Sequence, residues 1–435
     1  MTEDKPSSCI RPEQLDRSIR KLAKEHRTAS ICILSQTHLC RNPRVWKECR
    51  SLSEAGYSVV VLTTLYDDKM YQEDVQLLQN TTVRYECYAD LRRNRKNHIA
   101  KLYLKSLRKL GNWLVRSNLF NTALSLGYGH RVLYKKALNY RADLYICHQE
   151  MASYVGTQLL KKGKKVAFDI EDWYSEDLLP EARKNRPIAL LQKVERTALS
   201  QSSKVWTTSV ALAKAMASTY HTPAPAVIYN TFPSVNKERE TKCQDRVDPS
   251  KVSLFWFSQT IGPGRGLEIL INALRSVDLP FELHLRGIVS HHYKEMLSDQ
   301  FPKQTGQTLH FHPLVSNEEL PLRIAEHDIG LALESQSPPS RNFTITNKIL
   351  QYLEAGIAVV ASTTAGQKEV AAKAPEAVFL FDHTESLTAS INQLLSDREA
   401  LKRAKCQAKE LFSQHFLWES EAEKLCQLVE TALHP

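Results

Sequence analysis

The chain lacks the features that mark disulfide frameworks, zinc ribbons and membrane-spanning proteins. Its nine cysteines are scattered through 435 residues, form no Cys-x-x-Cys pair and are odd in number. A reducing compartment therefore fits best, and neither a disulfide framework nor a zinc ribbon is expected. The sequence contains no run of 18 apolar residues, and residues 1–27 hold no apolar segment like that of a signal peptide. We therefore expect a cytoplasmic protein.

Acidic residues are absent from one long segment. From Leu91 to Ala142 there are 13 lysines and arginines and no Asp or Glu, so the rest of the chain has a net charge of −3 (+10 minus +13). Apolar residues are interspersed with these charges, among them Leu102, Leu104, Leu107, Leu110, Trp113 and Leu114. This mixture favours an anionic membrane surface at the inner membrane face over nucleic acid. A solvated basic face without a partner is the alternative.

Length and composition predict a two-domain globular protein. A chain of 435 residues is too long for one core, and 42% hydrophobic with 24% charged residues is typical of globular proteins. The expected parts are a mobile lead (1–27), an N-terminal domain (28–235), a polar linker (236–251), a C-terminal domain (252–412) and a final segment (413–435). We expect the final segment to be a helix that packs back toward the N-terminal domain.

The first domain shows the alternation of strand and helix that is typical of a parallel α/β sheet. Ser30–Leu34 and Ser58–Leu62 are apolar strands, and the helix between them begins at Asn42-Pro43 and ends at Gly56. Residues 143–147 and 165–170 form later strands, and residues 204–208 and 227–230 close the domain. The pattern predicts a right-handed βαβ arrangement.

Polar residues follow the carboxyl ends of these strands, where open α/β sheets bind ligands. The candidates are two arginines after the first strand, a histidine after a later strand and three carboxylates after the next: Arg41, Arg44, His148, Asp169, Glu171 and Asp172. They could bind an acceptor or a sugar. The alternatives are surface caps for the arginines, a structural role for His148 and helix capping for the carboxylates.

The second domain opens with a strand, a glycine-rich turn and a helix. The strand Val252–Phe257 precedes the turn Ser258–Gly266, and the helix Leu267–Leu274 follows. Gly262, Gly264 and Gly266 would let the backbone approach a ligand, and the guanidinium of Arg265 suits phosphate. The spacing matches neither the dinucleotide fingerprint nor a Walker loop. A surface turn without a ligand is the alternative for Arg265.

A second helix start is predicted at Thr346-Asn347-Lys348. Ile345, Ile349, Tyr352 and Leu353 share one helical face, and Gly356 ends the helix before the buried strand 357–362. Free backbone N–H groups at such a start bind anions, and Lys348 adds a positive charge. An ordinary crossover helix remains the alternative. Residues 377–381 predict an edge strand, and two helices are expected to finish the chain.

Several motifs, in order, resemble those of the retaining nucleotide-sugar glycosyltransferases of family four. They are Asn42-Pro-Arg-Val-Trp-Lys-Glu48, His148 at a strand end, Phe168-Asp-Ile-Glu-Asp-Trp173, Val227-Ile-Tyr-Asn230, Gly264-Arg-Gly-Leu-Glu268, the run from Glu318 to Leu333, and Asn347-Lys348 with Gly356. The resemblance covers about residues 28–430 and implies a GT-B fold, with two Rossmann-like α/β domains facing across a cleft.

The resemblance also implies an activity and a set of site residues. A sugar would pass from a nucleoside diphosphate to a glycan or lipid-linked acceptor with retention of configuration, in polysaccharide synthesis and without a metal or cofactor; no Asp-x-Asp stretch occurs. His148, Arg265 and Lys348 would act in catalysis, and Arg41, Arg44, Asp169, Glu171 and Asp172 would bind the acceptor. The donor would contact Gln259, Gly262, Gly264, Gly266, Val315, Glu334, Thr346, Asn347 and Gln351.

Departures from the family pattern keep two other readings open. Phe343 and Gln351 stand where the family has two glutamates, and Gln259 replaces a usual basic residue. The chain could instead be a binding protein of this fold that has lost activity. A nucleotide-sugar 2-epimerase of the same architecture is a further alternative, although an epimerase has no need of a basic membrane-binding segment.

Overall fold

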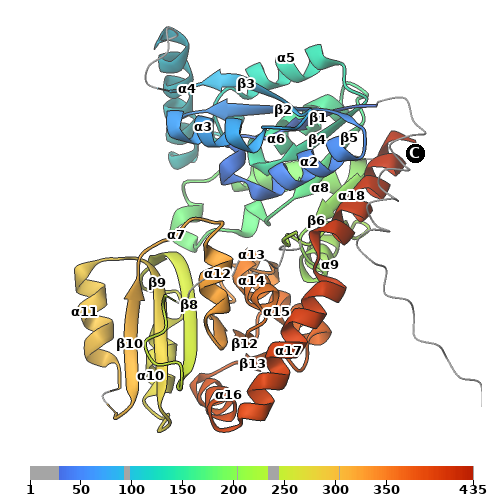
Figure 1. Cartoon of the computed structure of the whole chain (residues 1–435). Helices are drawn as coiled ribbons and strands as arrows, with labels where there is room; N and C mark the ends of the chain where they lie inside the picture. Colours follow the sequence, from blue (N-terminus) through green and yellow to red (C-terminus); the bar gives the residue numbers. More distant parts are fainter. Residues whose placement is uncertain (1–28, 93–97, 203, 234–243, 303, 435) are drawn as a thin grey trace, which may run out of the picture. The chain divides into compact units, whose positions relative to one another are not determined.

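The structure is a computed structural model that describes residues 29–92, 98–202, 204–233, 244–302 and 304–434. It divides into an N-terminal unit (Met1–Thr207, Met216–Ile228 and Glu419–Pro435) and a C-terminal unit (Thr208–Ala215 and Tyr229–Trp418). Both units are layered α/β structures (Figure 1). Within the described ranges, no helix combines the length and apolar composition needed to cross a bilayer. The expected lead 1–27 lies outside the described residues.

The N-terminal unit contains a seven-stranded parallel sheet in the order β3-β2-β1-β4-β5-β6-β7. The strands are β1 (Ser30–Leu34), β2 (Ser58–Leu65), β3 (Arg84–Asp90), β4 (Leu144–His148), β5 (Val166–Ile170), β6 (Lys204–Thr207) and β7 (Ala226–Val227). Strands are added on one side of β1 up to β3 and on the other side from β4 onward. The point between β1 and β4 is therefore the switch point, where doubly wound sheets bind ligands. The predicted parallel α/β class is confirmed.

The C-terminal unit repeats this design with six parallel strands in the order β10-β9-β8-β11-β12-β13. They are β8 (Val252–Ile261), β9 (Phe281–Val289), β10 (Gln307–His312), β11 (Ile329–Ala332), β12 (Ala358–Ser362) and β13 (Val378–Phe381). One sheet face carries the apolar core, which includes Leu254, Trp256, Leu283 and Leu285 packed with α10 (Leu267–Leu274) and α16 (Thr384–Ser396). The switch point lies between β8 and β11.

Helices cover both sheets. In the N-terminal unit they are α2 (Pro43–Glu54), α3 (Asp68–Leu77), α4 (His98–Arg116), α5 (His130–Tyr140), α6 (Gln149–Leu160), α7 (Pro180–Arg183), α8 (Ile188–Gln201) and α18 (Trp418–Leu433), with α9 (Val210–Tyr220) crossing the unit boundary. The other helices of the C-terminal unit are α11 (His291–Gln300), α12 (Leu320–Ala325), α13 (Pro339–Phe343), α14 (Asn347–Ala355), α15 (Ala365–Lys373) and α17 (Arg398–His415).

The sequence patterns misplaced some elements. The edge strand β3 was not predicted, and the loop after Glu334 contains the short helix α13. Strand β8 continues to Ile261 rather than ending at Phe257, because pairing with β9 resumes at Thr260 after a bulge. Gln259 therefore lies in a strand. The last strand of the first domain shrinks to Ala226–Val227, and three helices, not two, finish the chain.

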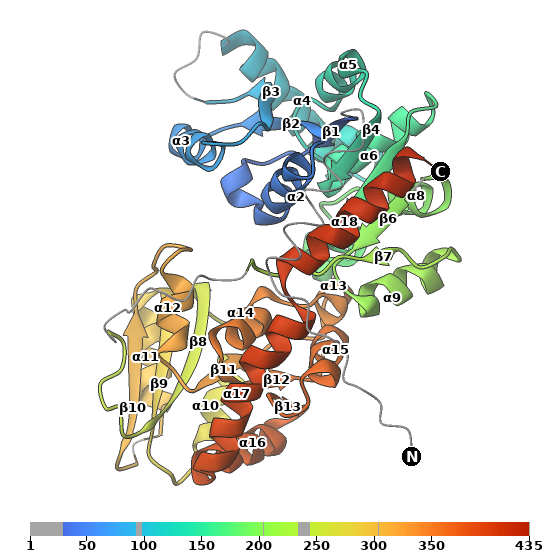
Figure 2. The same cartoon turned by 45° about the vertical axis from the view of Figure 1, so that its right-hand side comes forward.

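Two expected boundary segments are packed parts of the units. Of the linker 236–251, the described residues Gln244–Lys251 are held against the second sheet by side chains such as Asp245, which is 7% exposed and bonded to Arg286. Helix α18 packs in the N-terminal unit (Figure 2), where Tyr57 donates to Glu430 and Lys165 donates to the Leu433 carbonyl.

Candidate functional site

The switch point of the N-terminal sheet is occupied by a buried ion pair. The Asn42 side chain accepts from the backbone N–H of Val45 and so starts α2, which places Arg44 in the first helical turn facing the sheet. Arg44 Nε and Nη2 donate to the two carboxylate oxygens of Asp169 at 2.5 and 3.0 Å. Nη1 donates to the Ile228 carbonyl at 3.0 Å. Both side chains are almost fully buried, so they join α2, β5 and the segment after β7.

His148 is enclosed by three carboxylates. Its Nε2 lies 3.1 Å from Glu48 Oε2, and its Nδ1 lies 3.0 Å from Glu171 Oε1 and 3.3 Å from Asp169 Oδ2. Burial opposes a charge on the ring, but Glu48, Glu171 and Asp169 outweigh burial and raise the pKa of His148 to about 10. Burial and Asp169 raise the pKa of Glu48 to about 7. The ring is fully buried, so its predicted contact with a substrate stays a prediction.

The remaining acceptor candidates reach the surface of this edge. Arg41 is exposed at the end of a short 3-10 helix, Leu39–Arg41. Glu171 is 18% exposed and accepts from the Asn42 side chain at 2.9 Å. Asp172 is half-buried, and burial, with Asp177 and Glu171 nearby, raises its pKa to about 7. Asp172 can therefore give or take a proton near neutral pH.

In the C-terminal unit the glycine turn joins β8 to α10 beside the end of β11. Gly266 has φ +81°, and a Cβ there would lie 2.5 Å from the Leu333 Cβ, so only glycine fits. Gly264 has φ +70° with open space above it. The exposed Arg265 donates from Nη1 to the Ser258 hydroxyl at 3.0 Å. A ligand can therefore approach the backbone at Gly264 and meet the guanidinium.

The start of α14 lies across the switch point from this turn. Lys348 Nζ donates to Glu334 Oε1 at 2.6 Å, and both side chains are less than one-fifth exposed. Thr346 occupies the N-cap position, yet its side chain does not cap the helix, and its buried Oγ1 has no hydrogen-bond partner among the residues that the structure describes. The first N–H groups of α14 therefore lack the side-chain acceptor that an N-cap threonine usually gives.

A tyrosine and a glycine fix α14 on the sheet. The Tyr352 ring covers Gly330 of β11 so closely that any Cβ at position 330 would overlap the ring. The Tyr352 hydroxyl lies within hydrogen-bonding distance of two backbone carbonyl oxygens, that of Phe255 at 3.3 Å and that of Leu331 at 3.2 Å. This contact sets the position of Lys348, one helical turn earlier.

The other predicted donor residues lie at varied depths. Asn347 is exposed, with its Oδ1 3.4 Å from the Asn230 amide, and Gln259 is exposed near the end of β8. Gln351 and Phe343 are half-buried, as is Val315 in the loop after β10. The structure brings Gly262, Gly264, Gly266 and Arg265 together in one turn and Glu334 together with Lys348. No contact tests the donor role of any of these residues.

Glu48 and Asn42 were missed as site residues, although both stand in the motif that carries Arg44. Glu48 follows Arg44 by one helical turn, so a 3.6-residue repeat places both on the same face. Glu48 also accepts from the Trp206 indole at 3.3 Å. Glu48, His148 and Asp169 each offer a potential metal ligand atom within 4.8 Å of the others. Because Arg44 already occupies both oxygens of Asp169, we assign no metal there.

Comparison with protein-family models finds a match in the C-terminal part of the chain. Residues 265–427 match a family model described as glycosyl transferase-like, and this match covers less than half of the chain. Comparison with curated protein sequences finds no significant match.

Solved structures resemble almost the whole chain. Sucrose-phosphate synthase of Thermosynechococcus elongatus is 14% identical with a TM-score of 0.65, over 92% of this chain and 98% of that one. HepE of Anabaena, in complex with UDP and glucose, is 16% identical with a TM-score of 0.60, over 92% and 99%. A glycosyltransferase of Rickettsia africae is 12% identical with a TM-score of 0.60, over 94% and 99%. The two sheets match those of GT-B glycosyltransferase structures.

Proposed function

We propose that the chain is a glycosyltransferase that moves a sugar from a nucleoside-diphosphate sugar to a glycan or lipid-linked acceptor. We further propose that it acts with retention of configuration, like the family-four enzymes, in cell-surface polysaccharide synthesis. The observation that carries the proposal is a pair of cationic side chains beside helix starts in the C-terminal unit, which we call the anion site. There the turn with Gly264 and Arg265 and the start of α14 with Lys348 meet at one switch point.

This site suits a leaving diphosphate. Negative charge grows on the diphosphate as the sugar departs, and Arg265, Lys348 and the first N–H groups of α10 and α14 are the groups that would stabilise it. Because these groups would supply the positive charge that the diphosphate needs, we propose that the reaction at the donor site is independent of a metal. HepE has been observed with UDP-glucose, which supports a uridine nucleotide as the first donor to test.

The N-terminal site suits recognition of a hydroxylated acceptor. Arg41, Glu171 and Asp172 reach the surface at the carboxyl edge of the sheet, while Arg44, Asp169, Glu48 and His148 hold that edge from beneath. We propose that Glu171 and Asp172 orient acceptor hydroxyls and that His148 positions Glu171 through the 3.0 Å contact. His148 would then act on the transferred sugar or acceptor through this network.

The test is nucleotide binding by calorimetry and thermal shift with UDP and GDP, each with and without magnesium. Stabilisation by one nucleotide, unchanged by magnesium, supports metal-independent binding of a donor and identifies the base for a screen of donor sugars. Release of a glycoside in that screen supports a transferase. No response to either nucleotide at millimolar concentration contradicts the proposal.

We propose an anionic membrane surface as a partner, on the evidence of α4. Its outer face exposes Ile99, Leu102, Tyr103, Leu110 and Trp113, from 47% to 87% exposed. At 100° per residue these side chains fall within an arc of about 100°. Lys105, Lys109 and Arg116 are exposed beside that arc, and the opposite face is fixed, because Gly111 touches Ser125 and Leu124. Such a stripe suits the interface of an anionic bilayer.

Arg92, near the start of the basic segment from Leu91 to Ala142, does not contribute to this surface. Arg92 is 5% exposed and paired with Asp90 and Asp68, so it cannot meet lipid. Arg93, Arg95 and Lys96 lie outside the described residues. The proposed contact with lipid therefore rests on α4.

The second candidate is a nucleotide-binding protein of the same fold without transferase activity. It is favoured by Phe343 and Gln351, which place no carboxylate where the family has two, and by Glu334, whose Oε1 is engaged by Lys348. Nucleotide binding without release of glycoside, free sugar or epimer would support it. Release of an epimer would identify the third candidate, a nucleotide-sugar 2-epimerase.

A further inference from the structure

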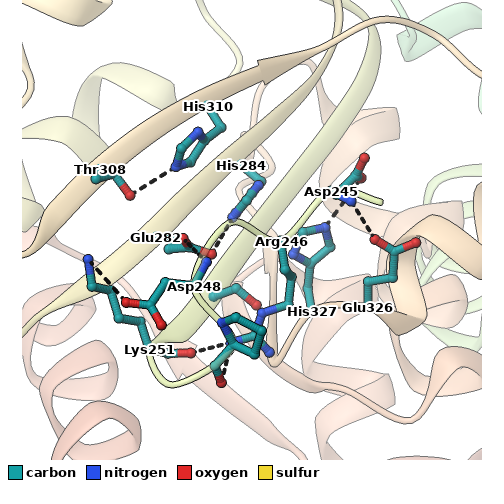
Figure 3. A network of polar contacts seen from close by, with 12 residues as sticks. Asp245, Arg246, Asp248, Lys251, Glu282, His284, Thr308, His310, Glu326 and His327 are labelled. Atoms are coloured by element: carbon teal, nitrogen blue, oxygen red, sulfur yellow. Dashed lines mark hydrogen bonds and ion pairs between the residues drawn. The ribbon is translucent and has the colours of Figure 1, made fainter. Parts of the chain in front are cut away.

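A strip of ionisable side chains lies on the face of the second sheet opposite its apolar core (Figure 3). Alternate residues of β9 share a face, so Glu282, His284 and Arg286 point the same way, and their β10 neighbours in register are Thr308, His310 and His312. Glu282 is 1% exposed and His284 is fully buried, whereas His310 is half-buried. The segment from Gln244 to Lys251 and His327 cover the strip.

The hydrogen bonds along this strip allow a tautomer in which His284 turns a lone pair toward Glu282. Asp245 is held as a carboxylate by two bonds from Arg286, at 2.7 and 2.5 Å, and His312 Nδ1 lies 3.4 Å from it. If His312 carries its proton on Nδ1, its Nε2 accepts from His284 Nδ1 at 2.9 Å.

In that tautomer two acceptors face each other. With its proton on Nδ1, His284 presents the lone pair of Nε2 to Glu282 Oε2 at 3.2 Å. Glu282 Oε1 already accepts from the Asp248 N–H at 2.8 Å, as expected of a carboxylate. In the other tautomer the Nε2–H of His284 donates to Glu282. In this one the lone pair and the carboxylate oxygen repel each other at this distance unless a cation lies between them.

We propose that Glu282, His284 and His310 bind a divalent transition-metal ion, with zinc as the expected occupant. One nitrogen or oxygen from each residue lies within 4.8 Å of the other two. Two imidazoles and a carboxylate are ligands that zinc takes, and the 3.2 Å separation is close to the edge of a tetrahedron with metal–ligand bonds of about 2.0–2.2 Å. Thiolate ligands play no part.

Closing the site requires one movement. The rings of His284 and His310 are stacked, with centroids 4.8 Å apart and planes 23° from parallel, so their lone pairs do not yet converge. His310 can turn, because it is half-buried on the edge strand β10 and bonds only the Thr308 hydroxyl among the described residues. His284 is held by His312, which is the support that a metal-bound histidine needs from its second nitrogen.

The site is separate from the anion site. Glu282 and His284 pair in register with Ser253 and Phe255, near the start of β8, whereas the glycine turn follows Ile261. Six or more residues of strand separate the two, or about 20 Å along the sheet. The metal would therefore bind β9 to the edge strand β10 rather than touch a nucleotide, and the proposal does not depend on the proposed function.

The test uses the full chain, treated with a chelator and titrated with zinc and then with cobalt. We expect one equivalent to bind saturably, with a tetrahedral cobalt spectrum that lacks a thiolate charge-transfer band. His310→Gln and Glu282→Gln should each weaken binding at least tenfold, while His291→Gln, at an exposed histidine of α11, should leave it unchanged. Because His310 is half-buried on an edge strand, we expect His310→Gln to fold. It therefore still tests the proposal if Glu282→Gln misfolds.

Two results would overturn the proposal. One is the absence of saturable binding of a single equivalent by the unaltered chain. The other is binding that persists in His310→Gln with a thiolate band, because cysteines would then hold the metal.

Discussion

Arg44 on α2 and Asp169 on β5 are separated by 125 residues and joined by two hydrogen bonds in a fully buried pair. Position at strand ends, together with the resemblance, assigned both residues to the acceptor. Because both are buried, we propose that they support the site: the pair holds the carboxyl edge of the first sheet, where Glu171 accepts from the Asn42 side chain.

Breaking this pair should destabilise the N-terminal unit. Arg44→Met leaves Asp169 charged and buried beside two other carboxylates, a change that costs about 3–5 kcal/mol. Arg50→Met is the matched control, because Arg50 pairs with Glu54 on the same helix with both side chains more than half exposed, and it should cost no more than about 1 kcal/mol. Urea unfolding measures both, and equal effects would contradict the assigned role.

The stability of the protein should fall as pH rises from 7 to 10. His148 has its pKa raised from 6.5 to about 10 by the carboxylates around it. Its contribution is therefore complete below pH 6.5 and is lost as pH rises through the folded-state value. His148→Gln should flatten this part of the pH profile of unfolding free energy, whereas His291→Gln should not. Parallel profiles for the parent and His148→Gln would show that His148 is not charged in the folded protein.

Arg265→Ala should weaken nucleotide binding without unfolding the protein. The guanidinium is exposed and its described bond is to Ser258, so its loss removes a charge-assisted bond to phosphate of about 1.5–3 kcal/mol, or roughly 10- to 150-fold in affinity. Arg275→Ala serves as the control, because Arg275 lies at the far end of α10, the helix that follows Arg265. Calorimetry with the nucleotide that binds the parent decides, and unchanged affinity would remove Arg265 from the phosphate site.

Two glycines of one turn should respond differently to alanine. Gly266→Ala forces a Cβ against Leu333 in a left-handed backbone and should cost about 2–4 kcal/mol. Gly264→Ala meets open space and should cost only the conformational part, about 1 kcal/mol. Urea unfolding compares the two variants, and a larger loss for Gly264→Ala would show that the turn is packed differently.

The outer face of α4 should control partition onto anionic vesicles. Ile99→Ser with Trp113→Ser removes two large exposed apolar side chains, each expected to contribute about 1.5–3 kcal/mol when buried in lipid. Vesicle sedimentation should show at least a tenfold loss of binding for this variant, and added salt should weaken the binding of the parent protein to the vesicles. Ile288→Ser with Leu314→Ser alters exposed apolar residues elsewhere and should leave binding intact. Equal losses in both pairs, or none, would contradict a role for α4.

Much of the fold could be predicted because apolar periodicity and caps are local. The bounds of α10 were predicted to the residue, and Asn42, Pro43 and Gly56 located α2. Strand β8 was predicted too short, because Ser258, Gln259 and Thr260 break the apolar pattern while the backbone continues to pair with β9.

Burial of polar residues was harder to predict. Alternating Glu282, His284 and Arg286 is the pattern of a solvated strand face, and only the packing of Gln244–Lys251 over it makes that face an interior. Likewise, nothing local distinguishes the buried Arg44 from the exposed Arg41. The proposed acceptor edge could be placed from the strand ends. Which of its residues are exposed to an acceptor and which are buried beneath them could not be predicted.

The packing of Tyr352 over Gly330 links two positions that have no proposed contact with a substrate. Any side chain at position 330 would displace the ring and, with it, the start of α14. Position 330 should therefore tolerate substitution only when residue 352 becomes smaller at the same time. An alignment of relatives should show the two positions varying together, and a mutational scan should find glycine 330 as intolerant as a residue of the anion site.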